Sequence, residues 1–415
     1  MAACGLDFGT SNTTLGHLGA AGPQLVPLED RHVTIPSAIF FEPNREPVIG
    51  RAATDAYVQG IPGRMMRSLK SVLGSGLIEE TTPVGRGRIR FRDVIGRYLA
   101  AVKARAEDAA GASFDTVVHG RPVHFVDGDA AGDRRAEETL RAIAEGIGFR
   151  HVSFQYEPIA AALDHERSVT REEIALIADI GGGTSDFSIV RLSPERHARA
   201  ERADDILAND GVRIGGTDFD RVLSLGTVMP LLGLGSPMRR PELSVPNAYF
   251  HDLATWSSIN RLYNARTLRE IAEIFRDGAR PELIARLRTV IELERGHSLA
   301  IAVEGAKIAA SDGGASEIDL GWVEPGLSAA IDRAALVAHT AMLAARISER
   351  VGRCLAQAGL RAEAIDALFL TGGSTGLPHV RAGLTACLPG ARVVAGDTFG
   401  SVGIGLTIEA IRRAA

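Results

Sequence analysis

Apolar positions recur at helical spacing in several long segments of the chain. Residues 93–110 and 133–146 have the pattern of amphipathic helices, and a helix with proline in its first turn is predicted from Pro158 to Arg167. Residues 266–312 and 332–358 are also predicted to be helical. These segments leave shorter apolar stretches between them, which have a different period.

The shorter stretches have the composition of β-strands. Phe187–Leu192 is β-rich and follows a run of glycines, which predicts a β-hairpin, and Asn12–Gly16 has a similar strand-like pattern. Ala364–Thr371 is an apolar strand that leads into a glycine-rich turn, and a helix is expected to start near Leu377-Pro378. Strands that alternate with helices predict an α/β fold.

Two of the predicted strands end in the same short motif. Residues 4–11 read CGLDFGTS and residues 176–186 read LIADIGGGTSD, and their aspartates, Asp7 and Asp179, are 172 positions apart. In each copy an apolar run ends in Asp and a glycine-containing turn then carries adjacent hydroxyls. The repeat predicts two related halves.

The glycine turns have the chemistry of a phosphate site. Consecutive glycines let backbone N–H groups approach an anion closely, and the hydroxyls add donors. An Asp at the strand end can hold hydrated Mg²⁺ or orient a water. The same residue types also favour an ordinary hairpin turn, but the second copy favours function. No Gly-Lys pair and no GxGxxG occurs, so neither a Walker A loop nor a dinucleotide fingerprint is present.

Composition restricts the possible classes further. The 415 residues are 45% apolar and 23% charged with net charge −5, which gives no footprint for nucleic acid or an anionic membrane. The three Cys form no CxxC pair, and the first residues do not resemble a signal peptide. We expect a cytoplasmic protein with neither nucleic acid nor membrane as a partner.

Lysine is rare in this chain. Only Lys70, Lys103 and Lys307 occur among 46 basic residues, and the remainder are Arg. A lysine that is kept is therefore a candidate for a task that needs a compact point charge.

The segment Gly372–Gly376 matches the GxSxG pattern of a nucleophile elbow. Only His379 and Asp397 follow Ser374 as partners, and they come in the wrong order for that fold. The esterase hypothesis is therefore rejected.

Three segments resemble the nucleotide loops of the Hsp70 ATPase domain, within the actin, Hsp70 and sugar kinase superfamily. Asp7–Asn12 resembles the first phosphate loop, Asp179–Asp186 the second, and Leu370–Pro378 the adenosine loop. Four more segments resemble the motifs TTPS, EPTAAA, GGEDFD and ExxKxxLS of Hsp70: Val33–Ser37, Glu157–Ala162, Gly215–Asp220 and Glu304–Ser311. All seven occur in family order across nearly the whole chain.

The resemblance implies binding of ATP or ADP with Mg²⁺. Ser68–Gly74 resembles the catalytic-lysine segment, so Lys70 is expected to act in catalysis with Glu157, Asp179 and Thr184. Asp7 and Asp179 are expected to hold Mg²⁺ through water. Lys103 is expected to be a solvated surface residue. The resemblance assigns nucleotide binding to Thr10, Ser11, Asn12, Gly181, Gly182, Gly183, Asp186, Gly215, Gly216, Glu304, Lys307, Ile308, Ser311, Gly372, Gly373 and Ser374.

The implied fold is an actin-like ATPase, a duplicated ribonuclease H-like motif with two lobes around a nucleotide cleft. Lobe I is expected over 1–170 plus 396–415, and lobe II over 171–395 with an enlarged outer subdomain at about 217–345. No segment resembles the β-sandwich and helical lid of Hsp70, so we expect no substrate-binding domain.

The chain departs from Hsp70 at three places. Ile308 and Gly376 stand where the family has two Arg that sandwich adenine, which predicts weaker or less adenine-selective binding. The family's Asp near the last helix is displaced, and the sequence around Asp397–Gly403 does not identify which residue takes its place. An insert at roughly 222–280, which includes Trp256, is either a helical elaboration or a docking site for a protein partner.

The expected function is Hsp70-like, slow ATP hydrolysis that switches closure of the lobes. One alternative is a nucleotide-sensing scaffold with little turnover. A small-molecule kinase is disfavoured because Glu157–Ala162 and Glu304–Ser311 match Hsp70.

Overall fold

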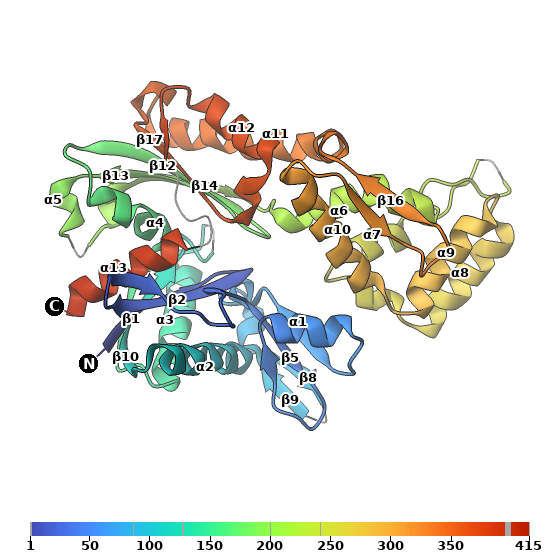
Figure 1. Cartoon of the computed structure of the whole chain (residues 1–415), viewed down its shortest axis with the longest axis horizontal. Helices are drawn as coiled ribbons and strands as arrows, with labels where there is room; N and C mark the ends of the chain where they lie inside the picture. The colour runs from blue at the N-terminus through green and yellow to red at the C-terminus, as the bar shows by residue number, and fades with distance from the viewer. Residues whose placement is uncertain are drawn as a thin grey trace. The chain divides into compact units, whose positions relative to one another are not determined.

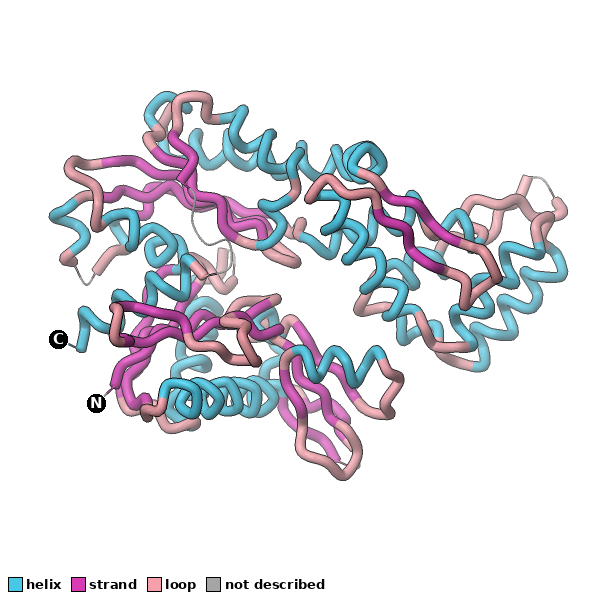
Figure 2. Tube along the Cα trace, in the orientation of Figure 1, coloured by secondary structure: helices cyan, strands magenta, loops and turns pink. Residues whose placement is uncertain are grey.

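Strands and helices alternate as the hydrophobic pattern predicts, and the computed structural model is a mixed α/β structure with several sheets (Figures 1 and 2). It describes residues 2–85, 87–126, 128–199, 201–240, 242–394 and 400–414. The α/β prediction is confirmed. The chain divides into two compact units: unit 1 is Met1–Arg213, Glu349–Thr375 and Leu384–Ala415, and unit 2 is Ile214–Ser348 and Gly376–Gly383.

Unit 1 contains two larger sheets with the same topology. The first has the strand order β11-β10-β1-β2-β3, with β4 also pairing with β2, and the second has the order β14-β13-β12-β17-β18. In each sheet the central strand, β1 or β12, is antiparallel to the next strand in sequence and parallel to a later one. The strands of the first sheet are β1 (Ala2–Phe8), β2 (Asn12–Gly19), β3 (Gly22–Leu25), β4 (Thr34–Pro36), β10 (Phe114–Arg121) and β11 (His151–Tyr156). Those of the second are β12 (Glu173–Ile180), β13 (Ser185–Leu192), β14 (Ile206–Val212), β17 (Ala367–Thr371) and β18 (Arg392–Val394).

The predicted helices of unit 1 form close to their expected bounds. They are α2 (Phe91–Ala110), α3 (Ala130–Gly146) and α4 (Glu157–Glu166). A further helix of this unit is α13 (Ser401–Ala414). The remaining elements of the segment 2–213 are α1 (Arg51–Val58), β5 (Ala38–Phe41), β6 (Val48–Ile49), β7 (Arg64–Arg67), η1 (Leu69–Val72), η2 (Gly76–Glu79), β8 (Thr81–Val84), β9 (Gly87–Arg90), α5 (Pro194–His197) and η3 (Ala203–Asp205). The predicted strand at 364–371 begins later than expected, because Ala362–Ala364 forms a 3₁₀ turn (η6) before β17.

Unit 2 is mostly helical and joins unit 1 through two helices that belong to both. The predicted helical segment 266–312 is three helices, because Gly278 and Pro281 separate the first two and Glu294, with φ 52°, separates the last two. The elements of this part are α6 (Gly216–Thr227), η4 (Met229–Leu232), α7 (Ala248–Ala254), η5 (Ile259–Leu262), α8 (Ala265–Asp277), α9 (Pro281–Glu292), α10 (Gly296–Ser311), β15 (Ser316–Asp319) and β16 (Ser328–Ile331). The helices shared with unit 1 are α11 (Arg333–Ala358) and α12 (Pro378–Cys387).

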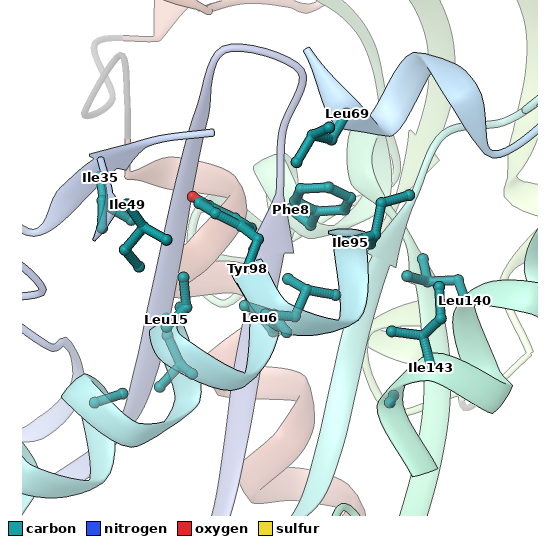
Figure 3. Packing of buried hydrophobic residues seen from close by; sticks show 14 of the residues in the cluster. Leu6, Phe8, Leu15, Ile35, Ile49, Leu69, Ile95, Tyr98, Leu140 and Ile143 are labelled. Atoms are coloured by element: carbon teal, nitrogen blue, oxygen red, sulfur yellow. The ribbon is translucent and has the colours of Figure 1, made fainter. Parts of the chain in front are cut away.

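Alternation along β1 determines which side chains face which helices. Leu6 and Phe8 belong to the apolar core that α2 and α3 form on one face of the first sheet (Figure 3). Asp7 therefore points to the opposite face, together with Gly5. In the second sheet Asp179 shares its face with Ile177, which packs in one cluster with residues of α4. The strand period thus places both motif aspartates on helix-covered faces.

Helices α13 and α4 cover those faces and cross each other. Helix α13 packs on β1, β2, β3 and β10, and α4 contacts β12, β13 and β17. A Cβ atom at Gly405 would lie 1.8 Å from the carbonyl oxygen of Ala160, and one at Gly5 would lie 2.3 Å from the backbone nitrogen of Thr407. These glycines permit backbone contact that a larger residue would prevent.

The environment of Lys103 differs from the one that the sequence predicts. Lys103 is not a solvated residue: its side chain is 13% exposed, it donates to Glu107 at 2.6 Å, and its ammonium lies over the Phe149 ring. Asp397 and the beginning of the segment around it lie outside the described residues.

No helix among the described residues is long and apolar enough to cross a bilayer.

Candidate functional site

The first motif forms a tight turn between β1 and β2. The Gly9 N–H donates to the carbonyl of Asn12 at 3.0 Å, which closes the turn over Thr10 and Ser11. A Cβ at Gly9 would lie 2.4 Å from the same carbonyl, so only glycine fits this position. The turn is held from outside by Ser37, whose hydroxyl donates to Gly9 O at 2.7 Å.

The second motif forms the same turn between β12 and β13. The Gly181 N–H donates to the carbonyl of Thr184 at 2.9 Å, which is the same pair of positions relative to the motif Asp. No heavy atom would lie within 4 Å of a Cβ at Gly183, so this part of the turn is open. The Thr184 hydroxyl donates to Asp186 at 2.8 Å.

The two turns and the loop after β17 come together within unit 1. A Cβ at Gly182 would lie 2.1 Å from the hydroxyl oxygen of Ser11, so the turns face each other at contact distance. Gly372, with φ 79°, lies against Asp179 and Ile180, since its Cβ would be 2.5 Å from Asp179 Oδ1. Ser374 donates its hydroxyl to Gly181 O at 3.1 Å.

A lysine–glutamate pair lies close to these turns. Lys70 Nζ is 2.5 Å from Glu157 Oε1, and the side chains are only 12% and 15% exposed. Lys70 is positioned by the buried Leu69, which packs in the same core as Phe8 (Figure 3). Glu157 is the first residue of α4, where the helix dipole favours a carboxylate.

Charge around this pair is unevenly compensated. Burial alone would lower the pKa of Lys70, but Glu157, Asp7 and Asp179 outweigh it and hold the pKa above its ordinary value. Burial, and then repulsion by Glu157, raises the pKa of Asp7 well above the usual range. Burial, with the charges of Asp186 and Glu157, raises the pKa of Asp179 to about 7. Three carboxyls thus share one ammonium, an arrangement that a further cation would stabilise.

The donor set fits hydrated Mg²⁺ better than a fully protein-bound metal. Carboxylate oxygens are the ligands that Mg²⁺ takes, and Mg²⁺ usually keeps several waters and uses one or two carboxylates plus phosphate. Among the described residues no group of three or more His, Cys, Asp and Glu side chains could hold a metal ion directly. Asp7 and Asp179 fit the first arrangement.

The predicted nucleoside residues of α6 and α10 lie together in unit 2. Lys307 is buried on α10, 2.7 Å from Asp220 Oδ1, and its ammonium donates to Gly216 O at 3.4 Å. Ser311 donates to the Lys307 carbonyl at 2.8 Å. Gly215 precedes α6, and its N–H donates to Asp218 at 3.0 Å.

Other predicted residues of this unit are more open to solvent. Ile308 is 54% exposed, and Glu304, one turn before it on α10, is half-buried. Gly376 is exposed, and no heavy atom would lie within 4 Å of its Cβ. Gly372, Gly373 and Ser374 belong to unit 1.

Sequence reasoning did not assign roles to several residues of these sites. Asp220 and Ser37 lie inside quoted motifs, so their segments were found although their contacts were not. Thr13 and Tyr98, whose hydroxyls lie 3.0 Å apart behind Ser37, had no motif to reveal them, nor had His119, which the charge of Lys70 affects. Their importance depends on contacts between residues as far apart as Thr13 and Tyr98, which spacing along the chain does not show.

A family model described as Hsp70 protein matches residues 3–225 and 294–391. The chain belongs to the Hsp70 family. It is 26% identical over 400 residues to the chaperone protein HscA of Pectobacterium atrosepticum. This alignment covers 91% of this chain and 53% of the relative. It is 25% identical over 378 residues to the chaperone protein DnaK of Halobacterium salinarum, at 91% of this chain and 50% of the relative. This Hsp70 chain spans about half the length of these curated relatives.

The Hsp70 match is interrupted where the sequence predicts an insert. Residues 226–293 fall between the two matched segments, and they form η4, α7, η5, α8 and α9. Many of their apolar residues are buried in unit 2, among them Phe250 and Ile271, whereas Leu243, Phe275 and Leu293 are exposed. The helical elaboration is therefore present in this Hsp70 chain.

Proposed function

We propose that this chain is a Mg²⁺-dependent ATPase of the Hsp70 type. ATP is bound by an actin-like pair of lobes, 1–170 with 396–415 and 171–395, which close on the nucleotide. Hydrolysis to ADP and phosphate is slow and switches this closure. The whole-length relatives are named chaperones. Client binding is not part of the proposal.

The two glycine turns bind the phosphates through backbone N–H groups and through the hydroxyls of Thr10 and Ser11. Thr184 joins them by turning its single hydroxyl proton from Asp186 to the phosphate. Lys70 places a positive charge beside the transferred phosphoryl group, and Glu157 fixes the direction of its ammonium. Asp7 and Asp179 hold the metal through water. Bound Mg²⁺ neutralises phosphate charge during hydrolysis.

The nucleoside is bound by the remaining predicted residues. Lys307, already anchored by Asp220 and the Gly216 carbonyl, offers its third donor to the ribose. Gly215, Gly216, Glu304, Ile308 and Ser311 lie on the same two helices or just before them. Gly372, Gly373 and Ser374, of the loop after β17, are also proposed to bind the nucleoside.

One observation carries the proposal. Two turns closed by the same backbone hydrogen bond, each beginning two residues after a half-buried Asp, meet at Ser11 and Gly182, and the charges of both aspartates act on the 2.5 Å Lys70–Glu157 pair. A structural role alone does not require two half-buried carboxyls beside a third that already pairs with the one ammonium.

Steady-state phosphate release with and without Mg²⁺ tests the proposal. Lys70→Ala is expected to lower turnover at least about 100-fold, the usual effect of removing one preorganised charge from a transition state. Lys103→Ala is the matched control, since Lys103 is also an ion-paired, mostly covered lysine on unit 1. Wild-type turnover no higher than that of Lys70→Ala would contradict hydrolysis.

A second candidate function is a nucleotide-dependent scaffold with little turnover. The observation that favours it is the helical insert, 226–293, which the Hsp70 family match leaves out. In this case the insert docks a protein partner. Nucleotide binding without phosphate release above the Lys70→Ala level would select the scaffold.

A further inference from the structure

In each phosphate turn, a serine from another segment donates its hydroxyl to a glycine carbonyl. The carbonyl of Gly9 accepts a hydrogen bond from the Ser37 hydroxyl at 2.7 Å, and the carbonyl of Gly181 accepts one from the Ser374 hydroxyl at 3.1 Å. Gly9 and Gly181 occupy the same position, two residues after the motif Asp. The two serines come from unrelated segments, so the same contact has been built twice by different elements.

Behind Ser37 the contact continues into the core. Thr13 Oγ1 is 3.0 Å from Ser37 Oγ, and Tyr98 OH is 3.0 Å from Thr13 Oγ1. Ser37 gives its only hydroxyl proton to Gly9 O, so it must accept from Thr13. Thr13 has then used its own proton, so it must accept from Tyr98, whose single proton is shared between Thr13 Oγ1 and the carbonyl oxygen of Pro36 at 3.1 Å. The protons therefore run in one direction, from Tyr98 through Thr13 and Ser37 to the turn.

The phenol of Tyr98 is unusual for its surroundings. Tyr98 is fully buried among apolar side chains of α2, β1 and β2, and its ring lies 5.8 Å from that of Phe8 (Figure 3). In Figure 3 its oxygen points toward the side where Ile35 of β4 lies. Phenylalanine would fill the same space without a polar atom to satisfy. Packing thus explains the ring but leaves the hydroxyl to be explained by Thr13 and by Pro36 O at 3.1 Å.

The hydroxyl chain decides which polar groups of the turn remain available. Ser37 holds two turn carbonyls, because its hydroxyl donates to Gly9 O and its N–H donates to Ser11 O at 2.8 Å. Because these two carbonyl oxygens accept hydrogen bonds from Ser37, they do not face a bound anion. Their partial negative charge then does not weaken the attraction between the N–H groups of the turn and a phosphate.

We propose that Tyr98, Thr13 and Ser37 form a positioning relay that presets the first turn for a phosphate group. The inference rests on the proposed function, since it names the residues that hold the phosphate turn of that same site. None of the three touches the nucleotide. They act through Gly9 and Ser11, and the affinity for the phosphate part of the ligand should depend on them.

The test compares two substitutions at the middle of the relay. Thr13→Val removes the hydroxyl and keeps the shape, whereas Thr13→Ser keeps the hydroxyl. Calorimetric titration with ADP and with adenosine separates phosphate binding from nucleoside binding. Thr13→Val is expected to weaken ADP about fivefold to tenfold and adenosine less than twofold, and Thr13→Ser to restore wild-type affinity for ADP.

Tyr98→Phe removes the first hydroxyl of the same relay, and it serves as the test variant should Thr13→Val fail to fold. Its control is Tyr263→Phe, which removes a hydroxyl that accepts from the Gly296 N–H at 2.9 Å in unit 2. Tyr98→Phe should lower the ratio of ADP to adenosine affinity, and Tyr263→Phe should leave it unchanged. A folded Thr13→Val or Tyr98→Phe with the wild-type ratio overturns the relay. Wild-type protein that binds no ADP overturns the proposed function itself, and the relay with it.

Discussion

His119 is a buried histidine next to the charges of the candidate site. It lies fully buried on β10, its Nδ1 is 2.9 Å from the carbonyl of Gly120, and its ring contacts that of Phe154. Burial lowers the pKa of His119 to about 4, with a further contribution from the positive charge of Lys70. His119 is therefore neutral in the folded protein at neutral pH.

This histidine predicts a loss of stability in mild acid. Between about pH 6.5 and pH 4 the unfolded chain binds a proton at His119 that the folded chain does not, so stability falls as pH falls. The difference amounts to roughly 3 kcal/mol over that window. Urea unfolding at several pH values should show a shallower pH dependence in His119→Asn, which retains a donor for Gly120 O. Equal slopes in the two proteins would contradict the prediction.

The residues expected at the adenine ring predict weak discrimination between ATP and GTP. Ile308 and Gly376 lack the guanidinium groups that stack on adenine, so wild-type affinities for ATP and GTP should be similar. Gly376 is exposed with open space around its Cβ, so Gly376→Arg should fit and should favour ATP about fivefold. Competitive titration with both nucleotides measures the ratio. Gly390→Arg, at another exposed and open glycine, controls for added charge; the same gain there would contradict a stacking effect.

At this scale the sequence was informative where a residue stands out by type or motif. Lys70 could be selected because lysine is rare, and the structure places it 2.5 Å from Glu157, which a separate motif had selected. Lys103 was wrongly expected to be solvated, since its cover comes from Phe149, forty-six positions away. Pairings of this kind depend on the fold and leave no local pattern.

Among the elements, the crossing of α4 and α13 is the most constrained. Gly405→Ala would place a methyl group 1.8 Å from the Ala160 carbonyl oxygen, and the backbone cannot yield easily. A loss of about 3 kcal/mol in unfolding free energy is expected, at the upper end for overpacking. Gly352→Ala on α11 is the control, since its Cβ meets nothing within 4 Å; it should stabilise by about 1 kcal/mol. Chemical denaturation measures both, and a neutral Gly405→Ala would contradict the close crossing.

The local sequence pattern predicted which helices and strands form, but it did not predict which strands pair with one another. The helices at 91–110 and 130–146 have clear periodicity, and the glycine hairpin after β12 follows from its composition. The parallel pairing of β12 with β17 joins strands almost 200 positions apart, and only the motif after each strand indicated that they meet. The breaks within 266–312 depend on single residues, Gly278 and Glu294, which a periodicity window averages out.

For the molecule as a whole, the prediction is that nucleotide and metal stabilise it together. At a ligand concentration 100 times its Kd, binding adds about 2.7 kcal/mol to the free energy of unfolding, which raises Tm by roughly 3 °C for a chain of this length. Without Mg²⁺ the carboxylates of Asp7 and Asp179 repel the phosphates, so EDTA should remove most of the shift. Differential scanning calorimetry with ATP, with and without Mg²⁺, measures it. An equal shift in EDTA would contradict a metal role for the two aspartates.

The contact between Gly5 and Thr407 has a consequence for how the chain is made. Strand β1 leaves the ribosome well before helix α13, which covers one face of its sheet and is synthesised about 400 residues later. At typical rates of 5–20 residues per second that delay is roughly 20–80 s. During this time the first sheet can pair its strands and bury Leu6 and Phe8 under α2 and α3, but its other face stays uncovered. Each newly made chain therefore passes through a period in which it is itself exposed to aggregation.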